Sequence, residues 1–329
     1  MPVLAALSFV SLPVMSPTPH PISEEVPDLG PVPHRLTIEV ETVRQLVEQQ
    51  FPQWSHLTIA PVRNQGWDNF TFQLGDEMAI RLPSAEEYAL AVEKEHRWLP
   101  EIATQVPVPI PLPLGLGQPG SGYPFRWSIY TWLPGEAAEP GSVTDPVGLA
   151  EDVSDFLGAL RGLDASGGPQ PGVHNWFRGA TLRTYDASTR SALTELGGHL
   201  DPALARAAWE DALAARWDGV DVWFHGDFAP ANLLLDRGRL NAVIDFGTCG
   251  VGDPSCDLAI AWTLLTPDGR QILRDRLSVD APTWSRGRGW ALWKSLVQLA
   301  GAVEDEDDAS VADALLTIEP IIEDYRANR

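Results

Sequence analysis

Short apolar runs bounded by turn-forming residues dominate the first third of the chain, and each run predicts a β-strand. Strands are expected at residues 57–62, 69–74, 78–82 and 125–133. Before them, apolar residues recur at helical spacing up to Phe51, and Thr37 is of the residue type that caps a helix N-terminus. The pattern therefore predicts a helix followed by a small sheet.

A second helix is expected after the third strand. Ser84 and Glu87 have the spacing of a capping box, and the apolar periodicity continues to about Leu99. At about 100° per residue, Glu95 falls in the middle of the apolar face, where a carboxylate needs a buried cation unless it reaches solvent. Arg81 is the nearest candidate, because it points away from its apolar neighbours on the strand. The alternative for Arg81 is a solvated position at the sheet edge.

Helical periodicity dominates the second half of the chain. Helices are expected at residues 147–163, 185–196, 202–217, 254–265, 284–303 and 309–325. Asp201 and Asp253, each followed by proline, are expected to cap two of them, with Ser255 as the alternative to Asp253. The β-rich segment of this half covers residues 222–247, with a turn at residues 236–238.

These elements predict an α+β protein with two lobes. A break at Pro134 and Gly135 separates a β-rich lobe at residues 36–133 from a mostly helical lobe at residues 134–329. Residues 1–35 are expected to be a disordered extension, because their latter part is rich in proline and acidic residues. The first residues lack the basic region of a signal peptide, and we expect translation to start at Met15.

Composition narrows the function classes. The chain of 329 residues has a formal net charge of −22, which argues against nucleic acid as a partner because no basic stripe can neutralise phosphates. No run of about 18 apolar residues exists, so no membrane partner is expected. Cys249 and Cys256 are too few for a disulfide framework, which favours reduced thiols in the cytoplasm. Monomer and homodimer both stay open.

Three polar residues in the segment 222–247 stand at the ends of short apolar runs. They are Asp227, Asn232 and Asp245. Phosphoryl transfer needs an acid that accepts a hydroxyl proton and oxygen ligands that hold a hard cation, and these residues supply both. The alternative is that the two aspartates only close turns or cap helices.

Two segments resemble the motifs of a known family. His225-Gly-Asp-Phe-Ala-Pro-Ala-Asn232 and Val243-Ile-Asp-Phe-Gly247 are similar to the catalytic and metal-binding motifs of the aminoglycoside phosphotransferase family, and Gly250–Ala259 looks like the continuation of the second. The resemblance covers roughly Leu57 to the end of the chain. It implies a protein-kinase-like fold and Mg²⁺-dependent transfer of the γ-phosphate of ATP or GTP to a hydroxyl of a small molecule.

The resemblance also implies roles for individual residues. Asp227 resembles the catalytic base, Asn232 and Asp245 resemble the Mg²⁺ ligands, and Asp257 is expected to support the loop through hydrogen bonds. The turn around Gly66 can bring backbone N–H groups close to phosphates, although an ordinary hairpin turn is the alternative. The nucleotide is expected to contact Gln65, Gly66, Trp67, Arg81, Glu95, Tyr130, Thr131, Trp132 and Leu133.

The chain departs from the family pattern in two places. Protein-kinase-like enzymes place a lysine on the third strand, whereas this chain has Arg81 there and its only lysines are Lys94 and Lys294. Arginine grips phosphate bidentately and with a different reach, so Arg81 is expected to anchor the nucleotide. Small apolar residues, Ala229–Ala231, also fill the catalytic loop, where they would influence the choice of acceptor.

The acceptor stays open at the level of sequence. A cationic acceptor such as an aminoglycoside suits the acidic surface, although solubility explains the same acidity more simply. A macrolide, a sugar, choline or another metabolite alcohol fits the motifs equally well, because fold and family do not fix a substrate. A nucleotide-binding regulatory protein without turnover is the alternative from another class. An aspartyl-phosphate phosphatase is disfavoured, because Asp68 and Asp76, the aspartates of the first lobe, lie in turns.

Overall fold

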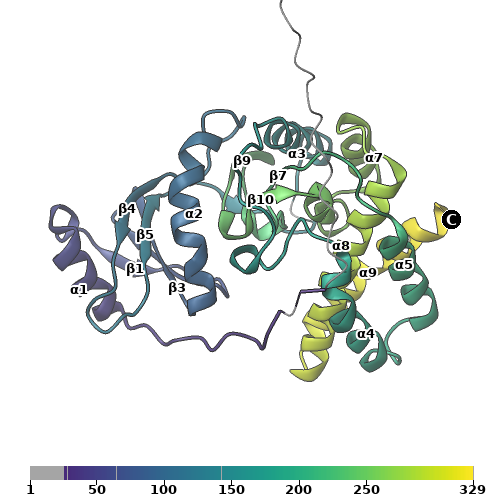
Figure 1. Ribbon diagram of the computed structural model, residues 1–329, viewed down its shortest axis with the longest axis horizontal. Helices are drawn as coiled ribbons and strands as arrows, with labels where there is room; N and C mark the ends of the chain where they lie inside the picture. Colours follow the sequence, from purple (N-terminus) through teal and green to yellow (C-terminus); the bar gives the residue numbers. More distant parts are fainter. Residues whose placement is uncertain (1–25, 28, 64, 142, 329) are drawn as a thin grey trace, which may run out of the picture.

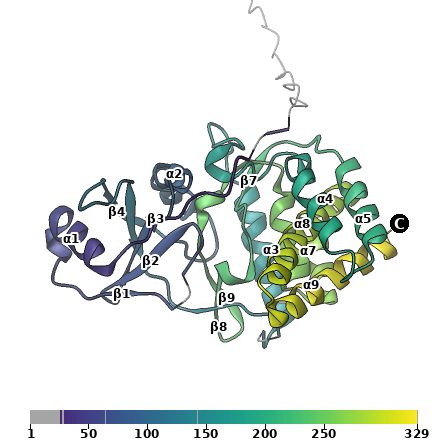
Figure 2. The ribbon, with the colours of Figure 1, turned by 90° about the horizontal axis from the view of Figure 1, so that it is seen from below.

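The computed structural model describes residues 26, 27, 29–63, 65–141 and 143–328. The β-rich part and the helical part lie at opposite ends of the molecule (Figures 1 and 2), as an α+β chain with two lobes requires. Met15 and most of the stretch expected to be disordered lie outside the described residues. Within those residues, no helix is both long and apolar enough to cross a membrane.

An antiparallel five-stranded sheet in the order β1-β2-β3-β5-β4 forms the N-terminal lobe. Its strands are β1 (Ile59–Pro61), β2 (Asn69–Leu74), β3 (Met78–Pro83), β4 (Pro113–Gly117) and β5 (Trp127–Thr131). The expected strands are present, whereas β4 was not expected. Proline has no backbone N–H to donate to a neighbouring strand, so a sequence rich in it does not predict a strand. An edge strand such as β4 tolerates proline, because one of its sides is unpaired.

One face of this sheet packs in an apolar core, and the other face carries Arg81. Helix α1 (Val40–Gln50) packs on one face, where Phe72, Ile80 and Ile129 belong to an apolar core. Arg81 is in register with Thr71 and Ser128 and, by alternation, points to the other face. Helix α2 (Glu86–Ile102) meets Arg81 on that face. The orientation expected for Arg81 is therefore confirmed.

The expected helix caps of this lobe are wrong. Helix α2 begins at Glu86, and its N-cap Ala85 offers no side-chain hydrogen bond. Ser84 is fully buried and donates its hydroxyl to the carbonyl of Trp67 at 2.9 Å, which fastens the β1–β2 loop instead of the helix. Helix α1 likewise begins after Glu39 and not after Thr37. Tertiary contacts decided these positions, not local capping patterns.

Helices build the C-terminal lobe around one large core. They are α3 (Pro146–Arg161), α4 (Asp186–Glu195), α5 (Pro202–Ala214), α6 (Ile260–Thr263), α7 (Pro267–Arg276), α8 (Ala281–Glu304) and α9 (Asp308–Ala327). Asp201 caps α5 by accepting from the backbone of Ala203 and Leu204, as expected. Helix α7 was not expected, although Thr266 caps it by accepting from the backbone of Gly269 and Pro267 opens its first turn.

Short strands in this lobe flank the loops that hold the polar residues of interest. They are β6 (Glu136–Ala137), β7 (Val222–Phe224), β8 (Leu233–Asp236), β9 (Arg239–Val243) and β10 (Gly250–Gly252). β7 pairs with β10, and β8 forms the expected hairpin with β9. Arg237 and Gly238 turn this hairpin with φ angles of 50° and 79°, a left-handed pair whose twist suits a tight turn.

Single turns of 3₁₀ helix complete the fold. They are η1 (Pro52–Trp54), η2 (Val173–Asn175), η3 (Leu182–Tyr185), η4 (Pro230–Asn232), η5 (Phe246–Thr248) and η6 (Pro254–Ala259). The helix expected over 254–265 is thus divided into η6 and α6. Asp253 caps its start as expected, accepting from the backbone and the hydroxyl of Ser255.

Candidate active site

Asp227 stands in a loop that buried hydrogen bonds hold in place. The fully buried carboxylate of Asp257 accepts from the backbone N–H groups of His225 and Gly226, both at 2.8 Å. Gly226 has a φ angle of +87°, and a Cβ atom there would lie 2.4 Å from the carbonyl oxygen of Thr248. Only glycine fits this position without strain. The supporting role expected for Asp257 is confirmed. Its hydrogen bonds fix the backbone of the two residues that precede Asp227.

Asn232 joins Asp227 to the segment that carries Asp245. Its amide nitrogen donates to the backbone carbonyl of Asp227 at 2.8 Å and to the Asp227 carboxylate at 3.2 Å. The backbone carbonyl of Asn232 accepts from the backbone N–H of Ile244 at 2.9 Å, and Ile244 directly precedes Asp245. The three polar residues that the sequence singled out are therefore neighbours in one hydrogen-bonded unit.

A hard cation fits this unit. The nitrogen of the Asn232 amide is occupied, which leaves its oxygen as a neutral ligand, and Asp245 offers a carboxylate that is 35% exposed. No cluster of three or more histidine, cysteine, aspartate or glutamate side chains in the described ranges could hold a metal alone. Mg²⁺ accepts this sparse set, because it keeps water and phosphate oxygens as its other ligands.

Arg81 lies between two carboxylates. Its guanidinium contacts Asp245 at 2.5 Å and Glu95 at 3.5 Å, and Glu95 also accepts from the Tyr130 hydroxyl at 2.8 Å. Burial alone would lower the pKa of Arg81, but Asp245 and Glu95 raise it. The cation that the buried Glu95 requires is therefore Arg81, as the sequence predicted.

The two lysines, which the sequence left without a role, both lie at the site. Lys294 on α8 forms an ion pair with the Asp227 carboxylate. Burial would raise the pKa of Asp227, but Lys294 holds it below its usual range. Lys94 on α2 donates to the carbonyls of Gly247 and Cys249 at 2.7 and 2.9 Å, and so ties α2 to the segment after Asp245. No spacing in the sequence pointed to either contact.

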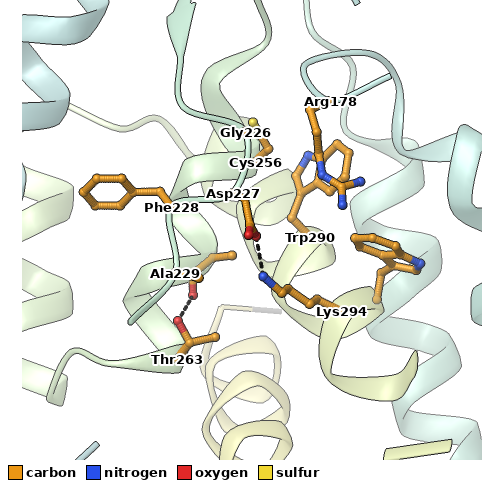
Figure 3. A pocket seen from close by; sticks show the side chains of 11 residues that line it. Arg178, Gly226, Asp227, Phe228, Ala229, Cys256, Thr263, Trp290 and Lys294 are labelled. Atoms are coloured by element: carbon orange, nitrogen blue, oxygen red, sulfur yellow. Dashed lines mark hydrogen bonds and ion pairs between the residues drawn. The ribbon is translucent and has the colours of Figure 1, made fainter. Parts of the chain in front are cut away.

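A pocket opens beside Asp227 (Figure 3). Its charged lining residues are Asp227, Lys294 and Arg178. Arg178 comes from the loop after η2, far from the motifs in sequence, and was not among the expected site residues. Trp290 and Trp293 of α8 also line the pocket, and the Arg178 guanidinium lies over both of their rings.

Apart from Arg81 and Glu95, the residues expected to contact the nucleotide lie in two places, the β1–β2 loop and the segment from Tyr130 to Leu133. The side chain of Gln65 bonds to the backbone of Val62 and Thr71, so it shapes the β1–β2 loop. Trp67 next to Gly66 is 59% exposed at the tip of the same loop. This loop reaches the polar centre through Asp68, whose carboxylate interacts electrostatically with Asp245 and Arg81.

The segment from Tyr130 to Leu133 connects the lobes. The Tyr130 ring is buried and points to Glu95, so its side chain supports Glu95 and offers no surface to a base. The backbone of Thr131 bonds to Leu112, and that of Trp132 bonds to Glu77. Thr131 and Trp132 line a second pocket, which also includes Trp54 and Asp76. Leu133 is half-buried.

A β-rich lobe facing a helical lobe, with Asp227, Asn232 and Asp245 at their junction, defines a kinase-like phosphotransferase fold. The chain belongs to the phosphotransferase enzyme family, whose model matches residues 59–290.

Curated relatives carry the names of antibiotic kinases. An aminoglycoside 3'-phosphotransferase of Escherichia coli is 37% identical over 65 residues, which are 19% of this chain and 24% of the relative. One from Streptomyces fradiae is 28% identical over 204 residues, or 57% of this chain and 69% of the relative. The chain thus matches about a quarter of the length of the first of these relatives.

Solved structures show the same fold. The GDP complex of aminoglycoside 2'-phosphotransferase-IIIa aligns with a TM-score of 0.61 at 15% identity, covering 86% of this chain and 98% of that one. A macrolide 2'-phosphotransferase from Brachybacterium faecium aligns with a TM-score of 0.53 at 20% identity, covering 85% and 98%. The kinase-like fold expected from the motifs is confirmed.

The environment of Asp68 gives a test of this geometry by pH. Burial and the Asp245 carboxylate raise the pKa of Asp68 to about 7, although Arg81 opposes the shift. The unfolded value is about 4, so the folded protein should lose stability as the pH rises from about 4 to 7 and Asp68 ionises. Asp68→Asn removes this loss. The melting temperature of the variant, without metal and nucleotide, should exceed that of the wild type above pH 7 and approach it near pH 4.

Asp76→Asn is the matched control, because Asp76 lies exposed in the β2–β3 turn. Because this change removes a carboxylate from the surface and not from beside Asp245, the gap predicted for Asp68→Asn should be missing in Asp76→Asn. A gap between Asp68→Asn and the wild type that is equal at pH 5 and pH 8 would show that Asp68 does not ionise in a buried acidic environment.

Proposed function

We propose that the protein transfers the γ-phosphate of a nucleoside triphosphate to a hydroxyl group of a small molecule. The observation that carries this proposal is the hydrogen-bonded unit of Asp227, Asn232 and Asp245. It holds a carboxylate for the acceptor hydroxyl beside oxygen ligands for a cation, which are the two parts that phosphoryl transfer needs at one place.

Asp227 acts as the base. Lys294 keeps its carboxylate ionised, so Asp227 accepts a hydrogen bond from the acceptor hydroxyl and orients the oxygen towards phosphorus. The new bond joins the acceptor oxygen to the γ-phosphorus, while the bond from that phosphorus to the β–γ bridging oxygen breaks. The hydroxyl proton passes to Asp227 and then to solvent, and the nucleoside diphosphate leaves with the electron pair of the broken bond.

The nucleotide, ATP or GTP, binds between a lobe at residues 36–133 and a lobe at residues 134–329. Asp245 and the oxygen of Asn232 hold Mg²⁺, which when bound neutralises charge on the phosphates. Arg81 leaves Asp245 and grips the phosphates, and Glu95 keeps the guanidinium in reach. Residues 65–67 cover the phosphates, and the base lies against residues 130–133.

The acceptor is a small hydroxylated molecule met in the cytoplasm, where nucleoside triphosphates are available. The names of the relatives support an aminoglycoside or a macrolide, so antibiotic resistance is one possible role. A metabolite alcohol of the choline or sugar type uses the same chemistry. A nucleotide-binding regulatory role without turnover is the alternative that the experiments below exclude or support.

The direct test is transfer of labelled γ-phosphate from Mg·ATP or Mg·GTP to a panel of aminoglycosides, macrolides, sugars and hydroxylated metabolites. We expect a labelled product from at least one acceptor, with release of the nucleoside diphosphate in equal amount. Binding of Mg·nucleotide without transfer to any member of a broad panel would favour the regulatory role. Failure to bind a nucleotide at all would refute the proposed function.

Asp227→Asn should lower kcat by about 10²-fold or more, because the amide cannot accept the proton. Nucleotide affinity, measured by calorimetry, should change little, since Asp227 contacts the acceptor and not the nucleotide. Asp236→Asn removes the same charge from an exposed position on the neighbouring hairpin and should leave kcat unchanged. Turnover of Asp227→Asn close to that of wild type would show that Asp227 is not the base.

Asp245→Asn should remove most of the Mg²⁺ dependence of nucleotide binding, because it deletes the anionic ligand. The measurement is calorimetric titration with nucleotide at several Mg²⁺ concentrations. Asp236→Asn again serves as the control and should keep the metal dependence of the wild type. If the affinity of Asp245→Asn still rose with Mg²⁺ as in the wild type, the cation would bind elsewhere.

Arg81→Gln should raise the nucleotide KM by about tenfold or more, because a charged hydrogen bond to phosphate is lost. Arg81→Lys keeps the positive charge but loses the bidentate hydrogen bond. Its nucleotide KM should therefore lie between those of the wild type and Arg81→Gln. Arg63→Gln is the control, since Arg63 is an exposed arginine at the end of the nearby strand β1. An unchanged KM in Arg81→Gln would place the phosphate anchor elsewhere.

A further inference from the structure

The pocket beside Asp227 has a charge opposite to that of the whole chain. The net charge of the chain is −22, yet the pocket is lined by two cations, Arg178 and Lys294, against one carboxylate, Asp227. A cleft with one sign of charge concentrates ligands of the other sign. The pocket bears on the identity of the acceptor, and the inference drawn from it rests on the proposed function.

Arg178 offers a guanidinium that forms no direct ion pair with a carboxylate among the described residues. Its guanidinium lies over the rings of Trp293, Tyr185 and Trp290, at 4.6, 5.0 and 5.4 Å from their centroids. It donates to the Tyr185 hydroxyl, and the carboxylates of Asp227 and Asp68 interact with it only electrostatically. The rings fix the guanidinium plane but do not neutralise it. Donors remain for an anion in the pocket.

The backbone that carries Arg178 is strained and held by specific contacts. The two residues before it, Trp176 and Phe177, have φ angles of 54° and 56°, a left-handed conformation that is unfavourable for residues other than glycine. The Tyr185 hydroxyl donates to the carbonyl of Trp176 while it accepts from Arg178. These contacts hold the guanidinium at the pocket (Figure 3).

Lys294 holds the second cation at the pocket. It pairs with one oxygen of the Asp227 carboxylate, the other oxygen accepts from Asn232 at 3.2 Å, and the Lys294 side chain is 30% exposed. A carboxylate accepts several hydrogen bonds, so an acceptor hydroxyl can bond to Asp227 while Lys294 keeps it ionised. The ammonium has three donors, which leaves donors for an anionic group beside that hydroxyl.

We propose that the acceptor is an alcohol that carries an anionic group, a carboxylate or a phosphate, which binds to Arg178 and Lys294 while the hydroxyl binds to Asp227. Trp290 and Trp293 pack against its carbon atoms. A polycation such as kanamycin would bring further positive charge to two cations that are already present. Such an acceptor is disfavoured here, although the outer surface is acidic.

The test is calorimetric binding of two matched series to the full-length protein, saturated with Mg²⁺ and a non-hydrolysable ATP analogue. The first series is glycerol, glycerate and glycerol 3-phosphate, and the second is glucose, gluconate and glucose 6-phosphate. Within each series the molecules share hydroxyl groups and differ mainly in charge. Kanamycin is the cationic probe. We expect at least one anionic member to bind about tenfold more tightly than its neutral counterpart, and kanamycin to bind more weakly.

Arg178→Gln should remove this preference, and Arg178→Lys should restore part of it. Arg183→Gln is the matched control, because Arg183 is an exposed arginine on the neighbouring turn η3 and does not line the pocket. It should keep the preference of the wild type. Comparison of the carboxylate and phosphate members shows which anion the pocket takes.

Three results would overturn the proposal: no anionic member binds, kanamycin or a neutral member binds as tightly, or Arg178→Gln keeps the preference. Weaker nucleotide binding in Arg178→Gln, with unchanged acceptor preference, would assign Arg178 to the γ-phosphate instead. Nucleotide binding to the wild type is measured first. Its absence refutes the proposed function, whereas its presence without an anion preference refutes this inference alone.

Discussion

The contact between Arg81 and Asp245 is the interaction on which the polar centre between the lobes depends. Arg81 belongs to the sheet and Asp245 to the helical lobe, and the ion pair at 2.5 Å joins them at the polar centre. Glu95 and Tyr130 hold the guanidinium from the side of α2. A phosphate or a cation must compete with this pair, because each would take one of its partners. A nucleotide that binds as proposed would therefore exchange one contact between the lobes for contacts to its phosphates.

Much of the fold and part of the site could be predicted from the sequence. Asp227, Asn232 and Asp245 lie close together in the chain and stand near the ends of apolar strands, so local pattern was enough to find them. The pairing of Arg81 with Glu95 followed from a physical constraint, because a carboxylate on an apolar helix face requires a cation. Local pattern gave a wrong prediction where a residue forms a tertiary contact instead. Ser84, for example, hydrogen-bonds to the carbonyl of Trp67 and does not cap α2.

Lys294 and Arg178 could not be predicted, for a different reason. Each reaches Asp227 from an element about 50 to 70 residues away in the chain, and no periodicity or motif records such a meeting. Lysines and arginines on surface helices are also common, so the residue type alone carries little information. Only the packing of α8 against η6 and the loop after η2 brings these cations to the pocket.

The residues proposed for the chemistry are close together in the sequence, whereas the residues proposed for acceptor specificity come from distant elements. The contiguous motifs build the parts that every phosphoryl transfer of this kind needs, and they lie in loops between short strands with buried support such as Asp257. The cations that line the pocket beside Asp227 come instead from α8 and from a loop that keeps Trp176 and Phe177 in a left-handed conformation. Strain of this kind persists only where surrounding contacts over-determine it. Substitutions in α8 and this loop can therefore change the acceptor while the motifs stay intact, and the family alone does not reveal what this chain phosphorylates.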